Sequence, residues 1–159
     1  MSRERLHTYA ATVTWVGSSA GSTATYAGYS REYALAFEGK DGILRGSADR
    51  AFRGDPTLMN PEDMLLASLS SCHLLSYLAV CALEGIEIVS YADRATAVMS
   101  ETGGSGHFVS ALLRPQVVVA DAARVERALE LHAKAHESCF VANSVNFPVT
   151  HEPDVTAIS

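Results

Sequence analysis

Two cysteines far apart in the sequence, and a carboxylate ahead of the first, are the residues of this chain best suited to chemistry. Cys72 lies ten residues after Glu62, and Cys139 follows 67 residues later. A thiolate is a nucleophile that peroxides oxidise, and an oxidised cysteine can condense with a second thiol to a disulfide. The combination therefore suggests thiol redox chemistry.

The spacing of the three cysteines limits which of them can pair. Cys72 and Cys81 are expected on one helix, where nine residues place them on opposite faces with about 13 Å of rise between them. A disulfide needs Cα atoms within about 7 Å, so these two cannot pair. Cys139 can meet either of them. Cys81 lies among small apolar residues and is interpreted as a buried apolar side chain.

The distance along the helix from Glu62 to Cys72 limits what Glu62 can do. Ten helical residues correspond to a rise of about 15 Å, so Glu62 cannot act directly on Cys72 of its own chain. Either its charge only complements the helix dipole in the first turn, or it serves a thiol of a second subunit.

The helix that carries Cys72 is predicted over residues 61–84. Asn60 can cap its N-terminus, Pro61 fits the first helical position, and Gly85 ends it. The segment is apolar nearly all round, which is typical of a buried or a membrane-spanning helix. Several serines interrupt it and no basic flank sets a membrane topology, so we expect a buried helix.

The remaining elements follow from periodicity and turn residues. Asp121 can cap a second helix over 122–138, and Cys139 follows its end. Strands are predicted over 7–16, 24–37, 43–47, 86–101, 107–119 and 145–156. This order predicts a single α+β domain over residues 1–159, with mainly antiparallel sheets around two main helices.

Composition excludes several classes of function. The net charge of −6 and the pI of about 5.4 argue against nonspecific binding to nucleic acid, which needs a basic surface. The first residues are polar, so no secretory signal is expected. Three cysteines are too few for a disulfide scaffold, and we expect a cytoplasmic protein with reduced thiols and no membrane partner.

Two motifs resemble the OsmC/Ohr family of thiol-dependent peroxidases. One is Asn60-Pro61-Glu62 with Cys72 ten residues later, and the other is the run 135–139, Ala-His-Glu-Ser-Cys. The order of elements is similar to that family along nearly the whole chain. The runs 52–56 and 141–149 look like a particular OsmC-like branch.

The resemblance implies a fold, an assembly and an activity. It implies an intertwined homodimer with an active site at each subunit interface, where Cys72 is the peroxidatic thiolate, Cys139 the resolving thiol, and Glu62 holds a catalytic arginine. It implies that organic hydroperoxides are reduced, with a dithiol such as dihydrolipoamide as reductant, in defence against oxidative stress. No cofactor is implied.

One departure from the family pattern concerns the arginine. The family arginine usually follows the first strand, but the turn 17–21 here reads Gly-Ser-Ser-Ala-Gly. A positive charge is needed beside Cys72 to favour its thiolate. Arg31 and Arg53 are the candidate replacements, and Arg53 is favoured because its loop leads directly into Glu62.

Two alternatives from other classes stay open. His132, His136 and Cys139 share one face of the second helix, and with Cys72 or His73 they could form a tetrahedral zinc site. The same fold without a suitable arginine could instead be a small-ligand binding protein that does not turn over.

Overall fold

The structure is a computed structural model that describes residues 4–158. The chain divides into two compact units, Met1–Met64 and Leu65–Ser159. The single domain expected over residues 1–159 stays a prediction. The α+β plan with two main helices is confirmed.

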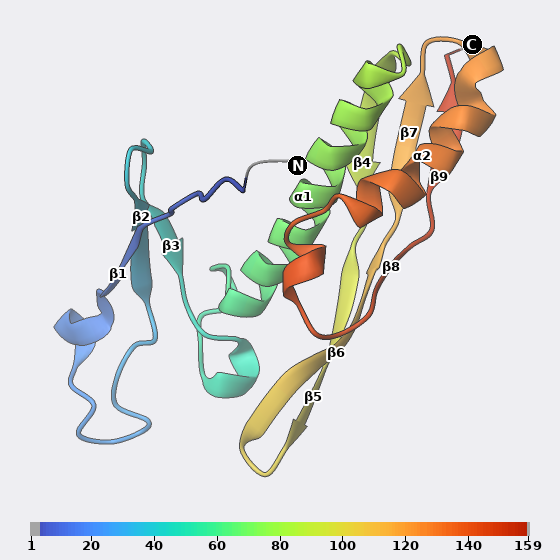
Figure 1. Ribbon diagram of the computed structural model, residues 1–159. Coiled ribbons are helices and arrows are strands. Elements are labelled where there is room, and N and C mark those ends of the chain that lie inside the picture. The colour runs from blue at the N-terminus through green and yellow to red at the C-terminus, as the bar shows by residue number, and fades with distance from the viewer. Residues whose placement is uncertain (1–3, 159) are drawn as a thin grey trace. The chain divides into compact units, whose positions relative to one another are not determined.

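The first unit contains a three-stranded antiparallel sheet of β1 (Ala11–Trp15), β2 (Tyr33–Phe37) and β3 (Leu44–Gly46), in the order β1-β2-β3 (Figure 1). The strand predicted over 24–37 begins only at Tyr33, because turns occupy most of the preceding residues. The Arg31 guanidinium donates to two carbonyl groups of that segment, which are therefore not used in a β-ladder.

Helix α1 (Pro61–Leu83) begins and ends where its local sequence predicts. The Asp63 backbone N–H donates to Oδ1 of Asn60 at 2.7 Å, and the Asn60 N–H donates back to Oδ2 of Asp63 at 3.1 Å. This reciprocal pair satisfies two N–H groups that a helix start leaves free. Gly85 has φ +67, and the Ile86 N–H donates to the Cys81 carbonyl at 2.9 Å, which closes the last turn.

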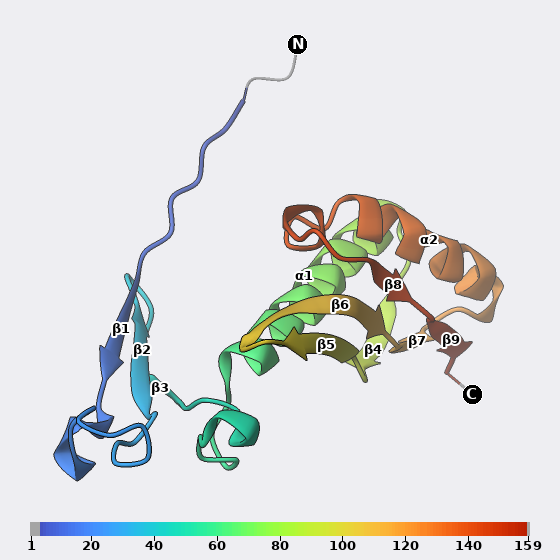
Figure 2. The same ribbon diagram turned by 90° about the horizontal axis from the view of Figure 1, so that it is seen from below.

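The second unit contains α1 from Leu65 onward, α2 (Val125–Glu137) and two three-stranded sheets. Figure 2 shows both helices on one side of the strands. One sheet has the order β4-β7-β9 and the other β5-β6-β8. Their strands are β4 (Ile88–Asp93), β5 (Thr96–Thr102), β6 (Ser105–Leu113), β7 (Pro115–Val119), β8 (Val149–His151) and β9 (Asp154–Ala157).

Three of the predicted strands are each divided in two. The strand expected over 86–101 breaks at Arg94, and that over 107–119 breaks at Arg114. Asp93 bridges the break, since its Oδ1 accepts from the Arg114 N–H at 2.6 Å and its Oδ2 accepts from Ser70 Oγ at 2.6 Å. The strand expected over 145–156 becomes β8 and β9. Both pair in parallel, with β6 and β7, so the sheets are mixed rather than only antiparallel.

The core of the second unit lies between the two helices and the β4-β7-β9 sheet. Cys81 is fully buried there, which confirms its interpretation as a buried apolar side chain. The buried members come from α1, the turn after it, β7, α2 and β9: Tyr77, Val80, Cys81, Ile86, Val117, Val119, Ala128, Leu131, Ala135 and Val155.

Only part of α1 is covered within one chain. By length and composition the helix could cross a membrane, but the core helix of a non-membrane protein passes the same test. Its buried side chains are Leu69, His73, Tyr77, Val80 and Cys81. Other apolar side chains are open, and Leu75 is 66% exposed and Leu83 86% exposed. A single chain therefore does not bury α1 fully, although the sequence predicted a buried helix.

Candidate functional site

Cys72 and Cys139 are in contact in the second unit. Cys72 lies on α1, and Cys139 follows the end of α2, where its N–H donates to the His136 carbonyl at 3.1 Å. The Cys72 thiol lies close enough to the Cys139 thiol to affect its protonation. All three cysteines are unpaired by disulfides. Of the two partners that the sequence left open for Cys139, the structure therefore selects Cys72 and not Cys81.

The two thiols of this pair differ in accessibility. Cys139 is buried, whereas Cys72 is half-buried. Burial, followed by the hydrogen bond with Cys72, raises the pKa of Cys139 to about 11. Cys139 therefore keeps its proton at neutral pH, and Cys72 is the thiol that a reagent from solvent can reach. An oxidised Cys72 would have a protonated thiol as its neighbour.

Four histidines gather beside the thiols, from α1 (His73), α2 (His132 and His136) and β8 (His151). His73 Nε2 and His132 Nδ1 lie 3.0 Å apart, and both residues are fully buried. The His151 ring centroid lies 5.5 Å from that of His73 and 5.3 Å from that of His136. The sequence pointed to three of these residues, but the place of His151 depends on the long-range pairing of β8 with β6.

The histidine cluster favours neutral rings. Burial, followed by the neighbouring histidines, lowers the pKa of His73 to about 4 and that of His132 to about 3. Nδ1 of His73 and Nε2 of His132 are buried without a hydrogen-bond partner. Among residues 4–158, no group of three or more His, Cys, Asp or Glu side chains is arranged to hold a metal ion. The geometry therefore gives no support to the zinc alternative.

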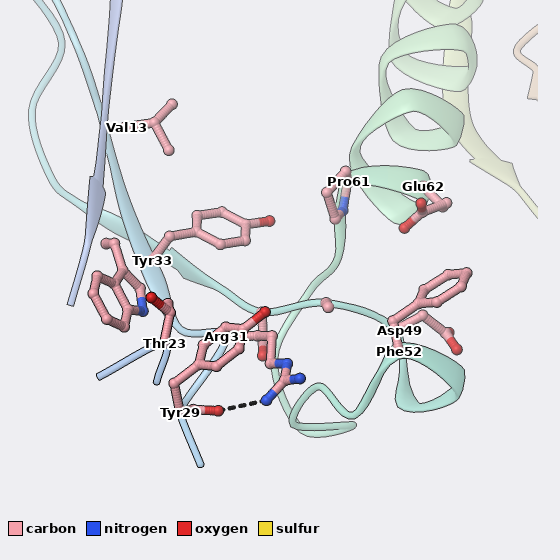
Figure 3. Close-up of a pocket in the computed structure, with 12 residues that line it drawn as sticks. Val13, Thr23, Tyr29, Arg31, Tyr33, Asp49, Phe52, Pro61 and Glu62 are labelled. Atoms are coloured by element: carbon pink, nitrogen blue, oxygen red, sulfur yellow. Dashed lines mark hydrogen bonds between the residues drawn. The ribbon is translucent and has the colours of Figure 1, made fainter. Parts of the chain in front are cut away.

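A cavity of about 520 Å³ lies in the first unit, with Arg31 and Glu62 on its wall (Figure 3). The other lining residues are mostly apolar or aromatic: Val13, Trp15, Thr23, Tyr29, Tyr33, Ser47, Ala48, Asp49, Phe52 and Pro61. The volume is within the range of ligand pockets, which is about 300–1,000 Å³. An apolar body of moderate size can therefore be accommodated.

Arg31 and Arg53 lie in different settings. The Arg31 guanidinium is 3.9 Å from the Tyr29 ring centroid, and it donates to the Tyr29 and Tyr26 carbonyls at 2.5 Å each. Arg53 is exposed, has φ +66, and is not on the cavity wall. The structure thus places Arg31, rather than the favoured Arg53, on the wall that Glu62 shares.

Glu62 has no ion pair with any arginine of the described residues, and its Oε2 atom is buried without a hydrogen-bond partner. The Tyr33 hydroxyl on the same wall is also buried and unpartnered. Burial raises the pKa of Tyr33, and the nearby charges of Glu62 and then Asp63 raise it further. The sequence placed Tyr33 only in a strand. Its aromatic side chain did not indicate that it would line the cavity.

Solved structures share this fold over nearly the whole chain. An OsmC-like protein of unknown function from Vibrio cholerae is 29% identical, with a TM-score of 0.83 over 94% of this chain and 100% of the other. An organic hydroperoxide resistance protein from Elizabethkingia anophelis is 16% identical, with a TM-score of 0.66 over 98% and 100%. One from Legionella pneumophila, 17% identical, has the same TM-score and coverage.

Sequence comparison adds a family assignment. No curated protein is significantly similar to the chain. The family model described as OsmC-like protein matches residues 54–154, a range that includes Glu62, both thiols in contact and all four clustered histidines. The family that the two motifs resemble is thereby confirmed: this chain belongs to the OsmC-like family.

Proposed function

We propose that this protein is a thiol-dependent peroxidase that reduces organic hydroperoxides. The single observation that carries the proposal is the contact between the Cys72 and Cys139 thiols, of which only Cys72 is accessible. Some relatives in fold are organic hydroperoxide resistance proteins, which is consistent with this chemistry.

The proposed reaction has three steps. The Cys72 thiolate attacks one peroxide oxygen, the O–O bond breaks, and the departing alkoxide takes a proton to become an alcohol, which leaves Cys72 as a sulfenic acid. The Cys139 sulfur then attacks the Cys72 sulfur, and the hydroxyl group departs as water with the Cys139 proton. An external dithiol, such as dihydrolipoamide, reduces the disulfide by thiol exchange and becomes oxidised itself.

The proposed functional unit is a homodimer. The open apolar face of α1 and the exposed apolar side chains Val13 and Trp15 of β1 are surfaces that a second copy would cover. Because Glu62 lies ten helical residues before Cys72, about 15 Å of rise, it would serve Cys72 of the partner subunit. We place the protein in the cytoplasm, where its three free thiols stay reduced.

Arg31 is the proposed source of positive charge for this site. Its guanidinium is fixed by two carbonyl groups and by the Tyr29 ring on the wall that Glu62 shares. A fixed charge that faces the reacting thiol would favour the thiolate over the thiol.

The test is steady-state consumption of cumene hydroperoxide with dihydrolipoamide as reductant. We expect turnover by the wild-type protein and none by Cys72→Ser. A wild-type protein that consumes no hydroperoxide with any small dithiol would contradict the proposal.

A second candidate function is the binding of a small ligand without turnover. The observation in its favour is that Glu62 makes no ion pair with an arginine of the described residues. Saturable binding to a wild-type protein that has no peroxidase activity would select this candidate.

A further inference from the structure

Helix α2 ends without the glycine that commonly closes a helix. The run 138–140 that follows it reads Ser-Cys-Phe, and Ser138 has a right-handed helical backbone with φ −91 and ψ −3. The last carbonyl groups of a helix have no partner within the helix. Those of α2 therefore need hydrogen-bond donors from the segment that comes after it.

Two of these carbonyl groups accept from residues beyond the helix. The Cys139 N–H donates to the His136 carbonyl at 3.1 Å. The Glu137 carbonyl accepts from a side chain, because the amide Nδ2 of Asn143 donates to it at 3.0 Å. Asn143 lies six residues after Glu137 in the sequence, so this bond folds the intervening segment back onto the end of α2.

Asn143 also bonds directly to the residue that carries the second thiol. Its backbone N–H donates to the Cys139 carbonyl at 3.0 Å. The two bonds of Asn143 thus reach Glu137 and Cys139, and they restrict the backbone on which the Cys139 thiol is placed against Cys72. Figures 1 and 2 both show this segment beside α1, the helix that carries Cys72.

The folded segment also acts on the Cys139 sulfur. Burial raises the pKa of Cys139 and the neighbouring Cys72 raises it further, whereas the backbone N–H groups of Ala142 and Val141 lower it. These N–H groups favour the thiolate, which is the form of a cysteine that attacks another sulfur. The turn that Asn143 holds in place therefore affects both the position and the reactivity of this thiol.

We propose that Asn143 is a positioning residue that holds Cys139 against Cys72 for formation of the disulfide. This deepens the proposed function and rests on it for the reaction with hydroperoxide. A group fixed beside its reaction partner reacts at a high effective concentration, which falls when the group can move away. The bonds of Asn143 go to the backbone of residues 137 and 139, so Asn143 acts on the step of Cys139 and not on that of Cys72.

The test uses dithiobis(nitrobenzoic acid), an aromatic disulfide that oxidises two thiols without any hydroperoxide. The Cys72 thiolate attacks one sulfur of the reagent, which forms a mixed disulfide and releases a first thionitrobenzoate. The Cys139 thiolate then attacks the Cys72 sulfur, which forms the Cys72–Cys139 disulfide and releases a second thionitrobenzoate, while the thiol protons pass to solvent. Only the first step depends on reagent concentration, so the absorbance of the released thiolate gives both rate constants.

In Asn143→Ala we expect the second rate constant to fall about fivefold, because one hydrogen bond no longer restricts the segment. The first rate constant should keep its wild-type value. Asn143→Asp replaces the donating amide by a carboxylate that only accepts, and it should separate the two steps in the same way. Asn146→Ala is the matched control, since Asn146 is exposed in the same loop, and it should leave both rate constants unchanged.

Each outcome decides the proposal. A second rate constant that is unchanged in both Asn143 variants, or that falls equally in Asn146→Ala, overturns it. An equal fall of both rate constants, or a wild type that releases fewer than two equivalents of thionitrobenzoate, also overturns it. Release that depends on Asn143, in a protein that consumes no hydroperoxide, supports this role while it contradicts the peroxidase. Circular dichroism of each variant establishes that it is folded.

Discussion

His73 Nε2 and His132 Nδ1 lie 3.0 Å apart in the core of the second unit, and this contact joins α1 to α2. One ring must donate and the other must accept, so the bond cannot exist when both imidazoles are fully protonated. Tyr77 stacks on the His132 ring, with ring centroids 3.8 Å apart. The packing of the two helices therefore depends on uncharged histidines.

We predict that the protein loses stability in mild acid. The folded-state pKa values of His73, about 4, and His132, about 3, lie below the ordinary 6.5, so the unfolded chain binds more protons as the pH falls. The uncharged rings of His73 and His132 stabilise the fold above about pH 6.5. This stabilisation is lost as the pH falls from there through 4. For His73 alone the loss is on the order of 3 kcal/mol. Urea unfolding at pH 7 and pH 5 measures the part of this loss that falls between those two pH values.

The control for this prediction is a double variant, His73→Leu with His132→Phe, which removes both titrating rings. Its free energy of unfolding should fall less between pH 7 and pH 5 than that of the wild type. His107→Gln changes an exposed histidine of β6 and should keep the wild-type pH dependence. An unaltered pH dependence in the double variant would show that His73 and His132 are not the cause.

The cysteine variants should divide the proposed reaction into its steps. Cys139→Ser should consume one equivalent of hydroperoxide and stop with Cys72 as a sulfenic acid, because no resolving thiol remains. Cys81→Ser should keep full activity with a small loss of stability, since Cys81 is a buried core residue. Mass spectrometry of the wild type after one equivalent of cumene hydroperoxide should find a Cys72–Cys139 link. A link through Cys81 is incompatible with the proposal.

The two arginines should differ in their effect on Cys72. Arg31→Met removes the charge from the cavity wall, so we expect the peroxidase rate to fall about tenfold or more. Arg53→Met changes an exposed arginine and serves as the matched control. Steady-state consumption of cumene hydroperoxide measures the rate of each variant. If Arg53→Met has the larger effect, the assignment must be reversed.

The apolar face of α1 predicts the state of assembly. Sedimentation at micromolar concentration should give twice the chain mass of 16.9 kDa. Leu75→Glu places a charge on the open face of the helix, and it should shift the equilibrium towards the monomer. A wild-type monomer under these conditions would rule out the homodimer.

Locally encoded features could be predicted from the sequence alone. The start of α1 depends on Asn60 and Asp63, which are three residues apart, and its end depends on Gly85. The Gly103–Gly104 hairpin turn has both residues at positive φ, which glycine adopts without strain. Each of these is decided by a few neighbouring residues.

Features that depend on long-range contacts could not be predicted. The parallel pairings of β8 and β9 involve residues that periodicity alone does not place together, and they bring His151 to the histidine cluster. Arg31 lines the same cavity as Glu62 because turns in the segment before β2 position it on the cavity wall. Arg53 was favoured because it is close to Glu62 in the sequence, but closeness in the sequence does not determine closeness in space.

β9 follows every other element of the second unit in the sequence, and this order has a consequence for synthesis on the ribosome. Asp154–Ala157 pairs in parallel with β7, and Val155 completes the core against α1 and α2. The core of this unit therefore cannot close until Asp154–Ala157 has left the exit tunnel. Until then the emerging chain exposes the apolar surface of both helices, and it is the species on which a ribosome-associated chaperone would act.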